Sequence, residues 1–171
     1  DGAILHSDIL IVPYARGQDL QFLAGEGPHL SPRLLDATLK SLTAVPERLA
    51  PIYETVAKVK AQLSPETTLL GFAGSPWTVA TYMVAGEGSR DHHDTRAMAY
   101  RDPGAFQAVI DAITDVTIEY LSGQVEVATG DAVDVVAGQG DDHVAIGDGD
   151  VGVVVGPLGS LADRVDQRHA G

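Results

Sequence analysis

The chain has 171 residues, enough for one domain with a sizeable core, and 44% of them are hydrophobic. Its net charge of −13, from 24 acidic and 11 basic residues, argues against nucleic acids and anionic membrane surfaces as partners. Cysteine is absent, no apolar run approaches the roughly 18 residues of a membrane span and no secretory signal is visible, which excludes a disulfide framework and favours a cytoplasmic protein.

The first third of the chain predicts a strand, a hairpin and a helix, in that order. Residues 3–5 are typical of a buried strand that ends in polar residues. Residues 9–23 hold two short apolar runs followed by Gly-Glu-Gly-Pro, which indicates loops and a small hairpin. From Pro46, apolar residues recur at steps of three and four, which predicts an amphipathic helix through Leu49, Ile52, Val56, Val59 and Leu63.

The middle of the chain continues the alternation of strand and helix. Residues 67–72 (TTLLGF) predict a strand, and residues 77–84 and 95–100 predict helices. Asp102 followed by Pro103 is a strong signal for a helix start, because aspartate caps helices and proline suits their first position. The apolar face of this last helix is formed by Phe106, Val109, Ile110, Ile113, Val116, Thr117, Tyr120 and Leu121. The alternation argues for an α/β protein with a parallel sheet.

Three segments carry a family resemblance: AILHSDIL from residue 3, GEGP from residue 25 and GFAGSPWTVATYMVAGEGS from residue 71. In this order and spacing they closely resemble the uroporphyrinogen decarboxylase family, and YRDPGAFQAVIDAITDVTIEYLSGQVE looks like that family's next helix. The match covers residue 1 to about residue 126. The resemblance implies a (β/α)8 TIM barrel, of which this chain would hold a part, in a cytoplasmic homodimer that uses no metal or organic cofactor.

The resemblance also implies a substrate and two site residues. The family converts the four acetate side chains of uroporphyrinogen, a tetrapyrrole, to methyl groups and so gives coproporphyrinogen. Its catalytic aspartate maps onto Asp8, where a carboxylate can accept pyrrole N–H groups and stabilise a cationic ring. A substrate-contacting tyrosine maps onto Tyr82. The small residues of the strand end, Gly71, Ala73, Gly74 and Ser75, are expected to leave room for a large flat ligand.

The chain departs from the family pattern at several points. His6 stands where phenylalanine is usual, and the arginine segment that binds substrate carboxylates would precede Asp1. A serine-bearing motif is expected after Val133, where the chain has DVVAGQGDD. Residues 137–140 (AGQG) are the amino acids that result when codons for Ser-Trp-Ala-Gly are translated in a reading frame shifted by one base. We therefore expect residues 1–128 to form a partial barrel. Residues 129–171, rich in Val, Gly, Asp and Ala, are expected to be disordered or to derive from a shifted reading frame, although residues 132–136 could form a strand.

Each motif also has an ordinary structural interpretation. Asp8 could simply cap a turn, and Tyr82 could be a core residue with its hydroxyl at the rim. The Asp-His-His-Asp run from Asp91 suggests a metal site, but adjacent side chains on a helix diverge, so a solvated helix start is expected. Residues 141–150 lack the spacing of a calcium loop, and residues 147–152 match a dinucleotide fingerprint without the required helix pattern. No metal or cofactor is therefore expected.

Two further functions are open besides the decarboxylase. One is a non-catalytic acidic interaction protein or an unstable truncated product, because half a barrel leaves sheet edges unpaired. The other is a relative of the corrinoid-dependent methyltransferases, which share the barrel. Those enzymes hold zinc with His and Cys, so the missing cysteine argues against them.

Overall fold

The computed structural model describes residues 2–5, 7–25, 27–129 and 151–155, and the chain divides into two compact units. Unit 1 comprises Asp1–Ile9, Leu49–Ser75 and Thr117–Gly171, and unit 2 comprises Leu10–Arg48 and Pro76–Val116. In the chain, each of the two segments of unit 2 begins a few residues after a strand of unit 1: the first after β1 and the second after β4. The second unit is therefore made of two long connections.

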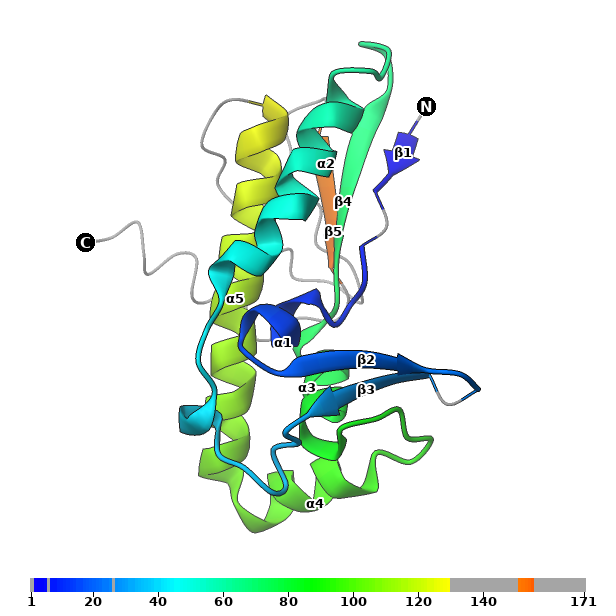
Figure 1. Ribbon diagram of the computed structural model, residues 1–171. Coiled ribbons are helices and arrows are strands. Elements are labelled where there is room, and N and C mark those ends of the chain that lie inside the picture. Colours follow the sequence, from blue (N-terminus) through cyan, green and yellow to red (C-terminus); the bar gives the residue numbers. More distant parts are fainter. Residues whose placement is uncertain (1, 6, 26, 130–150, 156–171) are drawn as a thin grey trace, which may run out of the picture. The chain divides into compact units, whose positions relative to one another are not determined.

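Unit 1 contains a parallel sheet with strand order β1-β4-β5 (Figure 1). The strands are β1 (Gly2–Ile4), β4 (Thr68–Ala73) and β5 (Val151–Val155). Gly2 lies opposite Thr68, and Leu69 lies opposite Val151. The Leu5 N–H donates to the Leu70 carbonyl at 2.9 Å, so the pairing of β1 with β4 continues beyond the end of β1.

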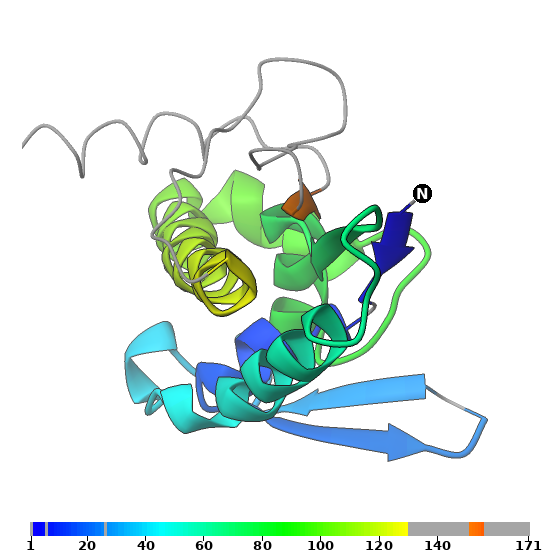
Figure 2. The ribbon, with the colours of Figure 1, turned by 90° about the horizontal axis from the view of Figure 1, so that it is seen from above.

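Two helices complete the core of unit 1, α2 (Ala50–Lys60) and the last part of α5 (Pro103–Thr129). Figures 1 and 2 show these helices beside one another along β4. Val56 of α2 is 3% exposed and Leu121 of α5 is fully buried, as the three- and four-residue spacing of apolar residues predicts. Val125, which lies beyond the predicted apolar face, is fully buried as well. The order strand, helix, strand, helix, strand confirms an α/β fold with parallel strands.

Unit 2 contains α1 (Ile11–Ala15), the hairpin of β2 (Asp19–Leu23) and β3 (Gly27–Ser31), α3 (Pro76–Ala85) and α4 (His93–Arg101). It also holds the first part of α5 and the short 3-10 helix η1 (Leu39–Ser41), and a second one, η2 (Pro46–Leu49), leads from unit 2 into unit 1. The hairpin is antiparallel and pairs Asp19 with Ser31 and Leu23 with Gly27.

Helix α3 forms the centre of unit 2, with Val79, Ala80, Met83 and Val84 fully buried. The end of α3 is joined to β3, because the Leu30 N–H donates to the Gly86 carbonyl at 2.7 Å. The buried Gln18 side chain donates to the Pro32 carbonyl at 2.8 Å and to the Met83 carbonyl at 3.3 Å. These bonds satisfy carbonyl groups that would otherwise be costly to bury.

A tight turn follows α1 at Gly17, whose φ is +100°. A side chain there would place its Cβ on the Thr43 carbonyl oxygen and 3.0 Å from the Thr43 nitrogen. Close by, the Val45 N–H donates to the Ala15 carbonyl at 2.7 Å. The segment that contains Thr43 therefore runs against the backbone of the turn, and only glycine fits there.

Most predicted elements agree with the structure within a few residues. The hairpin, the helix from Pro46, the strand at 67–72 and the three later helices are confirmed. The Asp102 cap is confirmed as well, since its Oδ1 accepts the Ala105 N–H at 2.9 Å. Helix α1 and strand β5 were not predicted. The strand suggested at 132–136 lies outside the described residues, and so does His6.

Among the described residues, no helix combines the length and the apolar character that crossing a bilayer requires.

Candidate functional site

Asp8 lies just beyond the carboxyl end of β1, in the turn that leads to α1. Its side chain is exposed, whereas the preceding Ser7 is 7% exposed. The carboxyl ends of β1 and β4 lie at the same edge of the parallel sheet, where ligand sites of α/β proteins form. The position therefore presents a carboxylate at the sheet edge that commonly carries a site.

A chain of hydrogen bonds joins this strand end to β4 and α5. The Tyr120 hydroxyl donates to Ser7 Oγ at 2.9 Å, and Ser7 Oγ donates to the Phe72 carbonyl at 3.3 Å. Gln124 Nε2 approaches the same carbonyl at 3.5 Å. Tyr120 is fully buried and Gln124 is 3% exposed. The helical pattern assigned Tyr120 only to an apolar face, and the serine beside Asp8 was the one available signal of this network.

A second tyrosine packs against the first. The ring centroids of Tyr53, on α2, and Tyr120 are 6.1 Å apart. A Cβ added to Gly123 would lie 2.7 Å from Tyr53 Cζ, so the missing side chain at this position lets the ring approach α5. Burial raises the pKa of Tyr120, and burial together with the neighbouring Tyr120 raises the pKa of Tyr53 to about 12.

These pKa shifts predict alkaline destabilisation of unit 1. A phenol whose pKa is higher in the folded than in the unfolded chain stabilises the fold below the unfolded pKa of about 10, and that contribution is lost as the pH rises through the folded pKa. The thermal unfolding midpoint should therefore fall between pH 10 and 12, as measured by circular dichroism. Tyr53→Phe should make this fall shallower, and an equal slope in both proteins would contradict the prediction.

The small residues after the apolar run of β4 are packed rather than open. Strand β4 includes Gly71 and continues to Ala73, and only two residues separate it from α3. Gly71 and Gly74 are buried, Ala73 is 5% exposed and Ser75 is 6% exposed. In this chain these positions therefore allow close packing of protein on the strand end, which differs from the expectation that they leave it open for a ligand.

Tyr82 lies on α3 and is partly exposed. A Cβ added to Gly88 would lie 3.3 Å from the Tyr82 hydroxyl, so the loop after α3 passes directly beside the phenol. This loop is attached to the hairpin by a β-bridge between Glu87 and His29, whose side chains approach to 3.7 Å. The phenol therefore lies beside a fixed backbone segment.

The two predicted site residues belong to different units, Asp8 to unit 1 and Tyr82 to unit 2. The structure places each of them within its own unit. A common cavity that contains both side chains stays a prediction.

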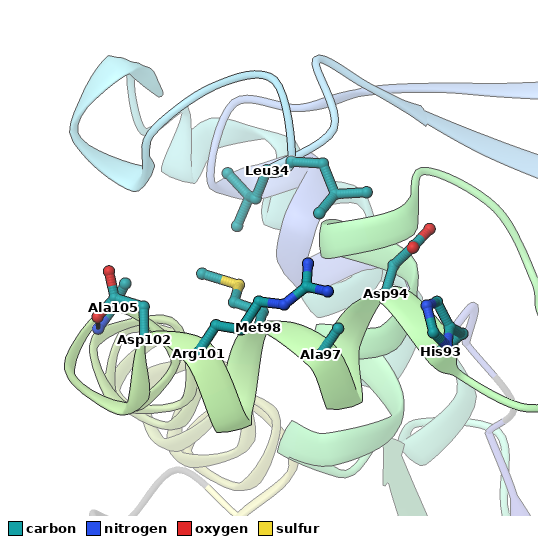
Figure 3. A pocket seen from close by; sticks show the side chains of 9 residues that line it. Leu34, His93, Asp94, Ala97, Met98, Arg101, Asp102 and Ala105 are labelled. Atoms are coloured by element: carbon teal, nitrogen blue, oxygen red, sulfur yellow. Dashed lines mark hydrogen bonds between the residues drawn. The ribbon is translucent and has the colours of Figure 1, made fainter.

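Unit 2 also contains a pocket of about 270 Å³ between the segment after β3 and helix α4. Figure 3 shows Arg101 reaching along the pocket toward Asp94, with Leu34 on the opposite wall. The other lining residues are Leu35, His93, Ala97, Met98, Asp102 and Ala105. Neither Asp8 nor Tyr82 lines this pocket, and Asp102 already acts as the helix cap.

The Asp-His-His-Asp run forms a helix start, as expected. Asp91 Oδ1 accepts hydrogen bonds from Ser89 Oγ at 3.0 Å and from the His93 N–H at 3.2 Å. The bond from Ser89 is the main cause that lowers the pKa of the Asp91 carboxyl. Asp91, His93 and Asp94 are exposed, and the described residues contain no group of three potential metal ligands.

Two of the arginines have structural partners. Arg48 Nη1 donates to the Tyr14 carbonyl at 2.7 Å, and its guanidinium lies 4.0 Å from the centroid of the Tyr14 ring. Arg33 forms an ion pair with Asp36. Arg48 is thereby tied to the Tyr14 backbone and ring of its own unit.

The family model that describes uroporphyrinogen decarboxylase (URO-D) matches residues 1–139. The uroporphyrinogen decarboxylase of Novosphingobium aromaticivorans is 91% identical over 126 residues, which are 74% of this chain and 37% of that protein. The one from Rhizorhabdus wittichii is 54% identical over 180 aligned residues, which cover 100% of this chain and 49% of that protein. The chain thus spans less than half the length of these relatives.

A methyltransferase from Methanosarcina mazei has a similar structure, with a TM-score of 0.56 and 14% sequence identity. The similarity covers 74% of this chain and 37% of that one. At this identity the comparison supports the α/β fold and carries no information on activity.

Proposed function

The chain belongs to the uroporphyrinogen decarboxylase family, and on that basis we propose that it is part of an enzyme that decarboxylates the acetate side chains of uroporphyrinogen to give coproporphyrinogen. The observation that carries this proposal is the 91% identity over 126 residues. The substrate would be the tetrapyrrole, with no cofactor. We further propose a cytoplasmic homodimer, as the family resemblance implies.

In the proposed reaction Asp8 acts by electrostatics. Protonation of a pyrrole carbon makes the ring cationic, and the C–C bond to the adjacent carboxylate then breaks, with its electron pair moving into the ring as CO2 leaves. A proton delivered to the resulting exocyclic carbon gives the methyl group, and loss of the ring proton restores the pyrrole. The Asp8 carboxylate would accept the pyrrole N–H groups and stabilise the cation throughout. Its position at the carboxyl edge of the sheet supports this role.

We assign Tyr82 to the rim of the same site. A phenol can donate a hydrogen bond to a substrate carboxylate or hold a water that carries a proton. The partial exposure of Tyr82 supports this assignment, and the close approach of the Gly88 backbone to the hydroxyl helps to hold the phenol in place.

The strand order supports the proposal of a partial (β/α)8 barrel. Within this sheet each later strand pairs in parallel with the strand that comes before it in the chain, so the sheet grows in one direction as β1-β4-β5. A barrel is built in this way, whereas a doubly wound sheet reverses direction at its centre.

We propose residues 1–128 as the barrel portion and residues 129–171 as a segment of different composition, although its strand β5 joins the same sheet as β1 and β4. The 126-residue match to the Novosphingobium protein supports a change in character near this boundary. The Rhizorhabdus protein aligns with the whole chain, so a native continuation is the alternative to a shifted reading frame. Sequencing of the coding DNA distinguishes the two. If the reading frame is shifted, another frame of the same DNA encodes the expected serine motif. If residues 129–171 are a native continuation, no other frame encodes it.

The activity can be tested by transplantation. The matched segment of this chain replaces the corresponding 126 residues of the Novosphingobium enzyme, and the chimera is given uroporphyrinogen. We expect conversion to coproporphyrinogen, measured by separating the oxidised porphyrins. The 171-residue chain alone should show negligible turnover, because the substrate carries eight carboxylates while the chain has a net charge of −13.

Two results would count against these expectations. A folded chimera that does not convert uroporphyrinogen would contradict the proposed activity of this segment. Turnover by the 171-residue chain above that of its Asp8→Ala variant would show that the chain needs no further residues.

A further inference from the structure

The strand end that presents Asp8 is attached to α5 through one buried hydroxyl. Tyr120 is 113 residues from Ser7 in the sequence, and its hydroxyl donates to Ser7 Oγ at 2.9 Å. Ser7 is the residue directly before Asp8, and its own hydroxyl donates a hydrogen bond to the Phe72 carbonyl near the end of β4. The strand ends of β1 and β4 and helix α5 therefore meet at Ser7.

Packing alone does not account for this hydroxyl. Tyr120 is fully buried, and a phenylalanine would fill nearly the same space without the cost of burying a polar group. The buried hydroxyl has a hydrogen-bond partner, which is the serine beside the proposed catalytic carboxylate. Burial raises the pKa of Tyr120, so the phenol keeps its proton and donates at neutral pH.

The hydrogen bonds have a defined direction. Tyr120 donates to Ser7, which leaves the single Ser7 proton for the Phe72 carbonyl. Gln124, one turn further along α5, approaches the same carbonyl at 3.5 Å. The Ser7 side chain is thus held from two sides, which limits the rotation of the backbone that leads to Asp8.

We propose that Tyr120 is a positioning residue, which acts through Ser7 to hold the backbone of Asp8 at the carboxyl end of β1. The proposal rests on the proposed function only in giving Asp8 a catalytic role. The hydrogen-bond chain itself belongs entirely to unit 1.

The test uses NMR spectroscopy of the 171-residue chain. The variants are Tyr120→Phe, Ser7→Ala and their combination, with Tyr53→Phe as the matched control. Tyr53 is the neighbouring tyrosine in the same unit, at a ring distance of 6.1 Å from Tyr120. The readouts are hydrogen exchange of the Leu5 amide, which is bonded to Leu70 at 2.9 Å, and the carboxyl carbon signal of Asp8.

We expect the Leu5 amide to exchange about tenfold faster in Tyr120→Phe and Ser7→Ala, which is the size of effect that one buried hydrogen bond gives. The Asp8 carboxyl signal should shift in the same two variants while the other aspartate signals stay in place. The double variant should add little to either single change, since both remove the same interaction. Tyr53→Phe should leave both readouts unchanged at neutral pH.

Several outcomes would overturn the proposal. One is an unshifted Asp8 signal in Tyr120→Phe with a lowered unfolding midpoint, which is the result of a purely structural role. Another is additive effects of the two substitutions, which would mean that Tyr120 does not act through Ser7. A wild-type Leu5 amide that exchanges as in an unfolded peptide would show that the hydrogen-bond chain does not form.

The proposed function is tested separately, in the chimera described above. If Tyr120→Phe shifts the Asp8 signal but Asp8→Asn leaves the chimera active, the positioning inference stands and the catalytic role of Asp8 is wrong. If Asp8→Asn abolishes turnover while Tyr120→Phe leaves the Asp8 signal in place, the catalytic role of Asp8 stands and the positioning inference is wrong.

Discussion

Replacement of Gly17 by alanine is expected to lower the unfolding midpoint of unit 2 by more than about 10 °C. The new Cβ would overlap the Thr43 carbonyl oxygen, and the backbone would have to keep φ at +100°. Strain at such a φ and overpacking each cost about 1–3 kcal/mol, and 1 kcal/mol moves the midpoint of a small domain by roughly 4–8 °C. Trp77, the single tryptophan of the chain, belongs to unit 2, so its fluorescence follows this transition.

Gly25→Ala is the matched control for this substitution. Gly25 also has a positive φ, +84°, but an added Cβ there has nothing within 4 Å. The free energy of unfolding of this variant should therefore fall only by the cost of the backbone strain, about 1 kcal/mol. Equal losses in the two variants would mean that the contact with Thr43 contributes nothing, and would contradict the close approach seen after α1.

Replacement of Asp8 by asparagine is expected to lower kcat/KM of the chimeric decarboxylase by about 100- to 1,000-fold. Asparagine has nearly the same shape but no charge, so it cannot stabilise a cationic ring as a carboxylate does. Because the Asp8 side chain is exposed, the unfolding midpoint should change little. The loss would then be catalytic rather than a failure to fold.

Glu66→Gln provides the control for this variant. Glu66 is exposed and lies just before the start of β4, at the amino edge of the sheet that Asp8 adjoins at its carboxyl edge. The substitution removes the same charge but should leave kcat/KM within about twofold, since barrel sites form at the carboxyl edge. Equal losses in Asp8→Asn and Glu66→Gln would mean that net charge, and not the position of Asp8, determines activity.

The elements with a strong local pattern could be predicted from the sequence. Helix α5 has an Asp-Pro start and apolar residues at helical spacing, and α2 has the same spacing after Pro46. Helix α1 has only five residues and a proline inside it, so local preference does not favour it. It forms because Val12 and Ala15 are buried, at 0% and 3% exposure, which is information that depends on the folded unit.

Strand β5 could not be predicted for a different reason. Residues 151–155 (VGVVV) are rich in β-branched residues, but they stand in a segment of biased composition without a clear period. What defines β5 as a strand is its pairing with β4, where Gly71 lies opposite Val153. Pairing partners this far apart in the chain leave no local trace in the sequence.

The residues of the candidate site also differ in whether the sequence could predict them. Asp8 and Tyr82 stand in sequence motifs, so they could be proposed without a structure. Tyr120 could not, because a tyrosine on an apolar helix face is ordinary and its bond to Ser7 joins residues 113 positions apart. A residue that supports a site through such a long-range contact can be identified only once the fold is known.

The one-directional strand order also bears on how the chain folds during synthesis. Strands β4 and β5 each find a partner in the part of the chain that has already left the ribosome. The nascent sheet can therefore lengthen at a single growing edge and never has to open an existing pair to insert a later strand. Until the next strand emerges, that edge is the surface a chaperone would have to shield.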